Sequence, residues 1–158
     1  IIKKSLKKFS GVQRRMTKIF STNKNDFYDD YAHHPTEIAS ILEGVKNVYQ
    51  NRKIITIFEP HRYSRVLSLK NKFVRSFEKS DLVLICPMYA AGEKRDSRFK
   101  IIEFSKQISK LSKTQVIIIK NYKEIQKFLK KNLVSDEIII GMGAGVISKH
   151  MRELETFL

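Results

Sequence analysis

The sequence has 158 residues, of which 42% are hydrophobic, and its formal net charge is +15. This length suits one domain with a hydrophobic core, and the hydrophobic content excludes a disordered tail. No hydrophobic run approaches the roughly 20 residues that a membrane span requires. We therefore expect one globular domain, residues 1–158, that does not enter a membrane.

The positive charge comes from 31 Lys and Arg residues against 16 Asp and Glu residues. This balance favours anionic partners such as phosphorylated metabolites or nucleic acid. Most of the excess is lysine on expected helix surfaces, where it is solvated. No element carries a stripe of arginine and aromatic residues, so we do not expect nucleic acid as a partner.

The single cysteine, Cys86, lies in the hydrophobic run LVLICP. One cysteine excludes an internal disulfide and favours a reducing compartment, the cytoplasm, and we interpret Cys86 as an unreactive core residue. The first residues, IIKKSLKKF, mix lysines among hydrophobic residues and do not form a signal peptide. Because the sequence begins without Met, we expect it to be a piece of a longer protein.

The first segments predict the end of a helix over 1–9, closing near Gly11, and then an antiparallel pair of strands over 14–20 and 27–31. From Pro35 onward, strands and amphipathic helices alternate. The expected helices cover 35–49, 65–78, 99–110, 122–132 and 146–158, and the strands lie in KIITIFEP, DLVLICP, TQVIIIK and EIIIGM. On the 99–110 helix, one face is expected to carry Ile101, Ile102, Ser105 and Ile108.

Hydrophobic strands that alternate with amphipathic helices indicate βαβ units and a parallel sheet covered on both faces. Right-handed crossovers then predict the α/β class, with a Rossmann-like three-layer sandwich. The sheet is expected to be mostly parallel, with an antiparallel hairpin at its N-terminal end. The sequence has no internal repeat and no linker, which supports a single domain.

Four chemically unusual stretches follow the ends of expected strands: DDYAHHP, EPHRYSR, PMYAAGE and GMGAG. Ligands of open parallel sheets bind at the carboxyl ends of the strands. We therefore expect the four stretches to line one rim of the sheet.

In EPHRYSR, Arg62 and Arg65 are three residues apart at the start of a helix and can face the same side. Two guanidiniums beside free backbone N–H groups suit a carboxylate or a phosphate. The alternative is a solvated pair bound to nearby glutamates. If the strand continues, Glu59 and His61 are expected to point to opposite faces, so at most one of them should lie at the rim.

In DDYAHHP, Asp29 or Asp30 could orient an arginine, a ribose hydroxyl or a metal-bound water. One histidine could hold a phosphate or polarise a substrate, while the other is expected to bond the backbone of the loop. A metal site built from an aspartate, a histidine of this stretch and His61 remains an alternative.

The stretch GMGAG is similar to a phosphate-binding turn, but Val146 occupies the third small position of a dinucleotide fingerprint. We interpret GMGAG as a tight turn that allows close helix packing. In PMYAAGE, Tyr89 and Glu93 could line the rim or face solvent.

The series GVQRR, DDYAHHPTEI, FEPHRYSR, YAAGE and GAGVI resembles the C-terminal domain of Mur ligases, specifically of the members that add L-alanine. The resemblance covers essentially the whole chain, and DDYAHHPTE and PHRYSR are its specific motifs. It implies that the full protein joins L-alanine to UDP-N-acetylmuramate in peptidoglycan synthesis, through an acyl phosphate, with ATP and Mg²⁺. The sequence lacks GxxxxGK[ST], so ATP and Mg²⁺ would bind mainly to an absent central domain, and we expect the isolated chain to be inactive.

The resemblance also implies roles for individual residues. Arg62 and Arg65 would bind the alanine carboxylate. Tyr31 and His33 would lie close to the substrate and the nucleotide phosphates as catalytic residues. The nucleotide would be contacted by Asp30 and Arg15, with Arg14 as a structural neighbour.

Two other functions remain open from the sequence. One is a stand-alone module that binds a phosphorylated ligand or nucleic acid through the arginine rim. The other is a small metallohydrolase that uses Asp30, His33 and His61.

Overall fold

One six-stranded sheet organises the computed structural model, which describes residues 13–22 and 24–158. The helix expected over 1–9 lies outside the described residues. The strand order is β1-β2-β6-β3-β4-β5, in which β1 is antiparallel to β2 and the other neighbours are parallel. The strands are β1 (Thr17–Ser21), β2 (Asp26–Asp30), β3 (Lys53–Phe58), β4 (Leu82–Ile85), β5 (Gln115–Ile118) and β6 (Glu137–Met142).

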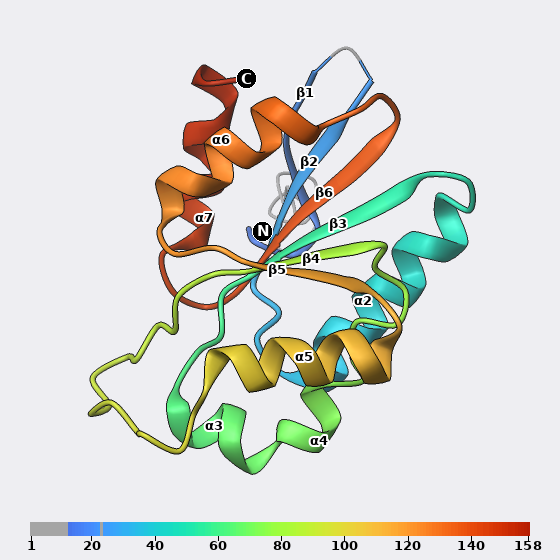
Figure 1. The fold of residues 1–158 in the computed structure, drawn as a ribbon. Helices are drawn as coiled ribbons and strands as arrows, with labels where there is room; N and C mark the ends of the chain where they lie inside the picture. Colours follow the sequence, from blue (N-terminus) through green and yellow to red (C-terminus); the bar gives the residue numbers. More distant parts are fainter. Residues whose placement is uncertain (1–12, 23) are drawn as a thin grey trace, which may run out of the picture.

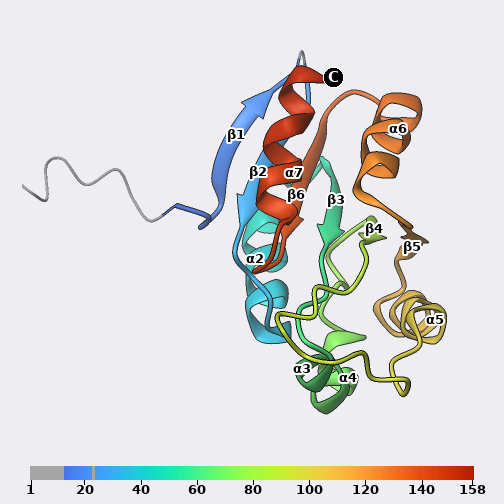
Figure 2. The same cartoon turned by 90° about the vertical axis from the view of Figure 1, so that its left-hand side faces the viewer.

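Helices cover both faces of the sheet, as Figure 1 shows, and this arrangement confirms the three-layer α/β sandwich expected from the sequence. On one face, α6 and α7 pack over the core cluster that contains Ile57 and Ile139, and Figure 2 shows α7 running beside β2 and β6. The helices on the other face pack over the cluster that contains Phe58 and Ile140. The helices are α2 (Pro35–Val48), α3 (Tyr63–Ser68), α4 (Lys70–Phe73), α5 (Ile101–Ser112), α6 (Tyr122–Asn132) and α7 (Ile147–Glu153), followed by the 3₁₀ turn η1 (Leu154–Thr156).

The register of the parallel strands brings their carboxyl ends to one level. Met142 pairs with Asp30 on one side and with Phe58 on the other. Phe58 pairs with Ile85, which pairs in turn with Ile118. The segments that follow these residues therefore leave the sheet along a single edge.

The first strand begins later than the sequence predicts. Arg14 and Met16 have positive φ angles of 59° and 45°, a region that residues other than glycine rarely adopt. The backbone N–H of Met16 donates to the carboxylate of Asp30 and not to a neighbouring strand. Residues 14–16 thus form a turn, and β1 starts at Thr17.

The expected helix over 65–78 is wrong as one continuous helix. It divides into α3 and the four-residue α4, and a series of turns follows Phe73. The hydroxyl of Ser112 on α5 accepts from the N–H of Phe77 and donates to the carbonyl of Val74, so bonds to a neighbouring helix replace helical ones. The hydrophobic residues still fill the core as expected, because Val66, Phe73, Val74 and Phe77 are all buried.

Helix α5 buries a slightly different face than the spacing predicts. Ile102 is 60% exposed, whereas Ser105 and Ile108 are buried as expected and Phe104 joins them. Ile102 follows Ile101 by about 100° around the helix, which turns it away from the sheet. Among the described residues, no helix combines the length and hydrophobicity that crossing a membrane requires.

Candidate functional site

The four unusual stretches meet at the edge formed by the strand ends, as the sequence predicts. The rings of His33 and His61 have centroids 5.7 Å apart. His61 stacks on Tyr89, with centroids 5.3 Å apart, and the two residues form an isolated parallel bridge. From the glycine-rich turn, the N–H of Gly145 donates to Glu59 at 2.9 Å.

At the end of β2, Asp30 organises the backbone. Its side chain is almost fully buried, and its two oxygens accept from the N–H groups of Met16 and Ala32, each at 2.7 Å. Burial raises the pKa of Asp30, and the two backbone hydrogen bonds oppose that rise. The carboxylate thereby fixes the turn that carries Arg15 against the end of the strand.

The adjacent histidines have different contacts. His34 caps α2: its Nδ1 accepts from the N–H of Thr36 at 3.3 Å, and Glu37 accepts in return from the N–H of His34. This is the backbone-bonding role expected for one of the two histidines. The Nδ1 of His33 lies 2.8 Å from the carbonyl oxygen of Tyr31. A carbonyl only accepts, so Nδ1 of His33 carries the proton and the lone pair of a neutral ring lies on Nε2.

Arg14 and Arg15 also differ in their surroundings. Arg14 donates to the carbonyl of Gly143, lies over the Tyr31 ring at 4.7 Å, and approaches the buried carboxylate of Asp29 at 3.6 Å. These contacts fit the structural role expected of Arg14. Arg15 is exposed, so its guanidinium is accessible to a ligand.

At the end of β3, His61 lies at the rim against His33 and Tyr89, whereas the Glu59 side chain is fully buried, so no more than one of the two lines the rim, as expected. The reason behind that expectation is wrong, because residues two apart on a strand share a face; the two side chains separate because the strand ends at Phe58 and Pro60 follows. The backbone of Glu59 still bonds β6 through Met142, but its side chain lies fully buried beneath the glycine-rich turn.

Arg62 and Arg65 flank His61. A guanidinium nitrogen of Arg65 lies 3.1 Å from Nδ1 of His61, and Arg62 caps the start of α3 with a φ angle of 67°. Burial lowers the pKa of His61, and the charges of Arg65, His33 and Arg62 lower it further. Both arginines therefore contribute positive potential at the same ring.

Neither Arg62 nor Arg65 forms an ion pair within residues 13–22 and 24–158. No glutamate forms a direct ion pair with either arginine in this part of the chain, although, beside the hydrogen bonds from Ser64, the charge of Arg62 contributes to lowering the pKa of Glu93. Glu93, the acidic residue of PMYAAGE, instead accepts from the hydroxyl and the N–H of Ser64, at 2.5 and 3.0 Å. The two guanidiniums are left available to an anion.

The glycine-rich turn is tightly packed, which confirms the interpretation of GMGAG. A Cβ atom at Gly145 would lie 2.5 Å from Oε1 of Glu59 and 2.5 Å from Cγ of Tyr89. A Cβ atom at Gly141 would collide with the side chain of Met151 on α7. The small residues allow the helix and the end of β3 to approach the turn closely.

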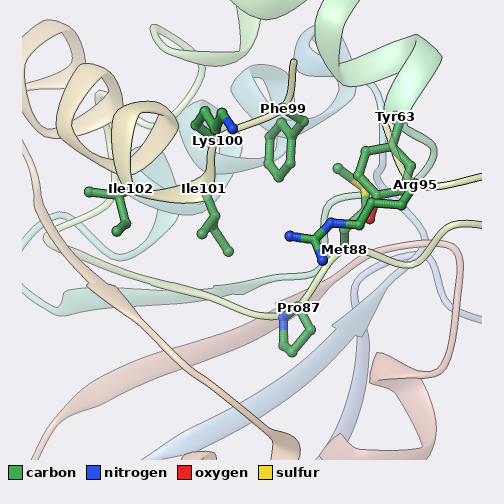
Figure 3. A pocket seen from close by; sticks show the side chains of 8 residues that line it. All are labelled: Tyr63, Pro87, Met88, Arg95, Phe99, Lys100, Ile101 and Ile102. Atoms are coloured by element: carbon green, nitrogen blue, oxygen red, sulfur yellow. The ribbon is translucent and has the colours of Figure 1, made fainter. Parts of the chain in front are cut away.

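Beside this rim lies a hollow of about 420 Å³ that the sequence did not predict. Tyr63 and Met88, which line it, are sequence neighbours of Arg62 and Tyr89. Figure 3 shows the Arg95 side chain extending into the hollow, between Phe99 and Pro87. Its remaining lining residues are Lys100, Ile101 and Ile102, so the hollow is hydrophobic and basic.

Sequence reasoning also missed Tyr122, Ser148 and Arg152. The hydroxyl of Tyr122 donates to Glu59, and Ser148 and Arg152 approach the carboxylate of Asp29 at 2.5 and 3.5 Å. Tyr122 could have been found because it follows the carboxyl end of β5, just as the other stretches follow theirs. Ser148 and Arg152 lie on α7 in an ordinary helical pattern that does not mark them.

The described residues do not fit a magnesium or zinc site. They contain no group of three or more His, Cys, Asp or Glu residues that could hold a metal ion. Both oxygens of Asp30, the aspartate of the metallohydrolase alternative, are occupied by backbone N–H groups.

Residues 14–145 match the family described as Mur ligase, glutamate ligase domain. The UDP-N-acetylmuramate–L-alanine ligase of Pelagibacter ubique is 50% identical over 154 residues, which are 98% of this chain and 33% of that protein. The chain thus spans about a third of the length of the curated relatives it matches.

Two solved structures share the fold over 97% of this chain and 31% of their own. One is a UDP-N-acetylmuramate–alanine ligase from Thermotoga maritima, with a TM-score of 0.75 and 25% identity. The other is a murein peptide ligase from Psychrobacter arcticus, with a TM-score of 0.75 and 22% identity.

Proposed function

Since the chain belongs to the Mur ligase family, we propose that it is the C-terminal domain, residues 1–158, of an ATP-dependent ligase that joins L-alanine to UDP-N-acetylmuramate. The full enzyme would contain two further domains, one for the UDP-sugar and one for ATP, and would act in the cytoplasm in peptidoglycan synthesis. The relative from Pelagibacter ubique, which is named for this activity and is about three times the length of this chain, supports the proposal.

The arrangement of Arg62 and Arg65 around His61 is the observation on which the proposal rests most directly. Both guanidiniums add positive potential at one ring at the carboxyl edge of the sheet, and neither forms an ion pair among the described residues. A carboxylate accepts two N–H groups from a guanidinium fork, which suits the carboxylate of L-alanine. This pair, the arginine clamp, would hold the amino acid with its amino group directed away from the charges.

The chemistry would take place above Tyr31 and His33. ATP would transfer its γ-phosphoryl group to the muramoyl carboxylate, and the alanine amino group would attack the resulting carbonyl carbon. A C–N bond forms, the acyl C–O bond breaks and phosphate leaves, while the nitrogen loses a proton. In its neutral form, His33 has its Nε2 lone pair free to accept that proton, and Tyr31 packs edge-on against it with centroids 5.1 Å apart.

The nucleotide would be contacted by Arg15 and supported by Asp30. The guanidinium of Arg15 is exposed, whereas Asp30 fixes the turn that carries it. Asp30 would therefore act on the nucleotide mainly through the position of this turn. Mg²⁺ would neutralise phosphate charge when bound to the rest of the enzyme, because the described residues here do not provide its ligands.

A phosphate-release assay tests this function. The complete polypeptide, supplied with ATP, Mg²⁺ and UDP-N-acetylmuramate, should release phosphate only when L-alanine is added. The isolated chain should release none, because it lacks a phosphate-binding GxxxxGK[ST] loop. Alanine-independent turnover, or turnover by the isolated chain, would contradict the proposal.

A further inference from the structure

Glu59 is a buried carboxylate that no basic side chain neutralises within the described residues. It is fully buried, and its oxygens accept from the hydroxyl of Tyr122 at 2.5 Å and from the N–H groups of Gly145 and Val146 at 2.9 and 3.2 Å. An ionised group in a protein interior is costly unless hydrogen bonds satisfy it. These three donors are therefore what keeps the carboxylate in place.

The Glu59 carboxylate connects three segments that are distant in the sequence. It leaves the end of β3, lies under the glycine-rich turn after β6, and bonds the first residue of α6. Burial and the neighbouring Glu59 raise the pKa of Tyr122, which keeps the phenol protonated and donating. Tyr122 is itself held by stacking on His150, with ring centroids 4.0 Å apart.

The arginine clamp begins three residues after Glu59. Arg62 has a φ angle of 67°, and a residue other than glycine persists there only when its surroundings hold it. On one side, the N–H of Arg62 donates to the carbonyl of Tyr89 at 2.9 Å, and the N–H of Tyr89 donates to the carbonyl of Pro60 at 2.8 Å. On the other side, the contacts of the Glu59 side chain fix the start of the same segment.

We propose that Glu59 and Tyr122 are positioning residues for the amino-acid carboxylate, acting through the placement of Arg62. Neither residue would touch the substrate itself. Their hydrogen bond holds the segment from Glu59 to Arg62 against the glycine-rich turn, so that the clamp keeps its geometry when the site is empty. The inference rests on the proposed function, since it requires Arg62 to bind alanine.

The substitution Tyr122→Phe tests this most cleanly, because it removes one hydroxyl and leaves the ring stacked on His150. In the complete enzyme, we expect the KM for alanine to rise about 3- to 10-fold, with kcat and the KM for ATP nearly unchanged. A matched control is Tyr49→Phe, which removes a hydroxyl bonded to Tyr28 at 3.2 Å at the C-terminal cap of α2. The control should leave the KM for alanine unchanged.

Glu59→Gln gives a second, nearly isosteric test. Its amide keeps one acceptor oxygen for Gly145 but presents an NH₂ group to the N–H of Val146. The KM for alanine of Glu59→Gln should rise at least as much as that of Tyr122→Phe. It should rise further in Glu59→Ala, so the glutamine variant should keep part of the alanine affinity that the alanine variant loses. A Tyr122→Phe variant with a lower Tm and an unchanged KM for alanine would overturn the inference, because the pair would then be merely structural.

A double substitution shows whether the effect passes through Arg62. Arg62→Ala combined with Tyr122→Phe should have the alanine KM of Arg62→Ala alone, because the guanidinium that Glu59 and Tyr122 position is then absent. If the double variant instead raised the alanine KM by the product of the two separate factors, the inference would be overturned. If Arg62→Ala itself leaves the alanine KM unchanged, the clamp of the proposed function fails, and the inference with it. If Arg62→Ala raises the KM while Tyr122→Phe and Glu59→Gln do not, only the positioning role fails.

Discussion

A guanidinium nitrogen of Arg65 lies 3.1 Å from Nδ1 of His61, and this contact determines the tautomer of the histidine. A guanidinium can only donate, so Nδ1 of His61 accepts and the ring proton lies on Nε2. Burial and the charges of Arg65, His33 and Arg62 all lower the pKa of His61. The imidazole at the centre of the rim is therefore held in its neutral form.

This lowered pKa predicts a pH dependence of stability. The unfolded chain binds a proton on His61 near the ordinary histidine pKa of about 6.5, whereas the folded chain binds it only at lower pH. Between the lowered pKa of folded His61 and about pH 6.5, the unfolded state therefore holds more protons than the folded state. The free energy of unfolding should rise with pH over this range and level off above it. Urea unfolding of the chain between acidic and neutral pH measures this, and His61→Gln should reduce the slope. Equal slopes for both proteins would contradict the prediction.

The packing of the glycine-rich turn predicts opposite effects at two glycines. In Gly145→Ala, the new methyl group would lie 2.5 Å from Glu59 and Tyr89, so we expect a loss of about 1–3 kcal/mol in the free energy of unfolding. In Gly44→Ala, within α2, nothing lies within 4 Å of the new Cβ, and we expect a gain of about 0.5–1 kcal/mol. Thermal unfolding compares the two variants. A stable Gly145→Ala protein would mean that the turn is looser than described.

The different surroundings of Arg14 and Arg15 predict that substituting Arg14 lowers the stability of the protein, whereas substituting Arg15 weakens nucleotide binding. Arg14→Ala removes the bond to Gly143 and a charge beside buried Asp29, and should cost about 1–3 kcal/mol of stability. Arg15→Ala should leave stability unchanged because its side chain is exposed, but it should raise the KM for ATP in the complete enzyme. If the two effects are exchanged between the variants, the assignment of Arg14 and Arg15 is wrong.

The structure also predicts that Cys86 is unreactive. Its side chain is fully buried, and burial raises the pKa of the thiol well above its usual range. Only the thiolate reacts with disulfide reagents, so native protein should react far more slowly than protein in urea. Rapid labelling of the native chain would contradict the described core around β4.

Much of the fold could be predicted from the sequence because the hydrophobic pattern is regular. The runs that form β3, β4 and β6 are continuous and hydrophobic, as expected for parallel strands that are buried on both faces of a sheet. Once parallel strands are expected, the stretches at their carboxyl ends must meet at one edge. The convergence of His33, His61 and Tyr89 therefore followed from topology alone.

What could not be predicted depends on contacts between distant residues. The helix over 65–78 divides because Ser112, on another helix, forms hydrogen bonds with Phe77 and Val74. The position of Glu59 depends on its bonds to Tyr122 and to the glycine-rich turn, which the alternation of a strand does not describe. Local periodicity contains no information about either interaction.

The KM for alanine of an Arg62→Ala variant of the complete enzyme tests the central claim most directly. Loss of a charge-assisted bond to the carboxylate should raise this KM about 10- to 100-fold, while the KM for ATP should change little. Arg75→Ala, at another exposed arginine, is the matched control and should behave like the unmodified enzyme. An unchanged alanine KM in Arg62→Ala, with normal turnover, would show that the amino acid binds elsewhere and that the arginine clamp does not exist.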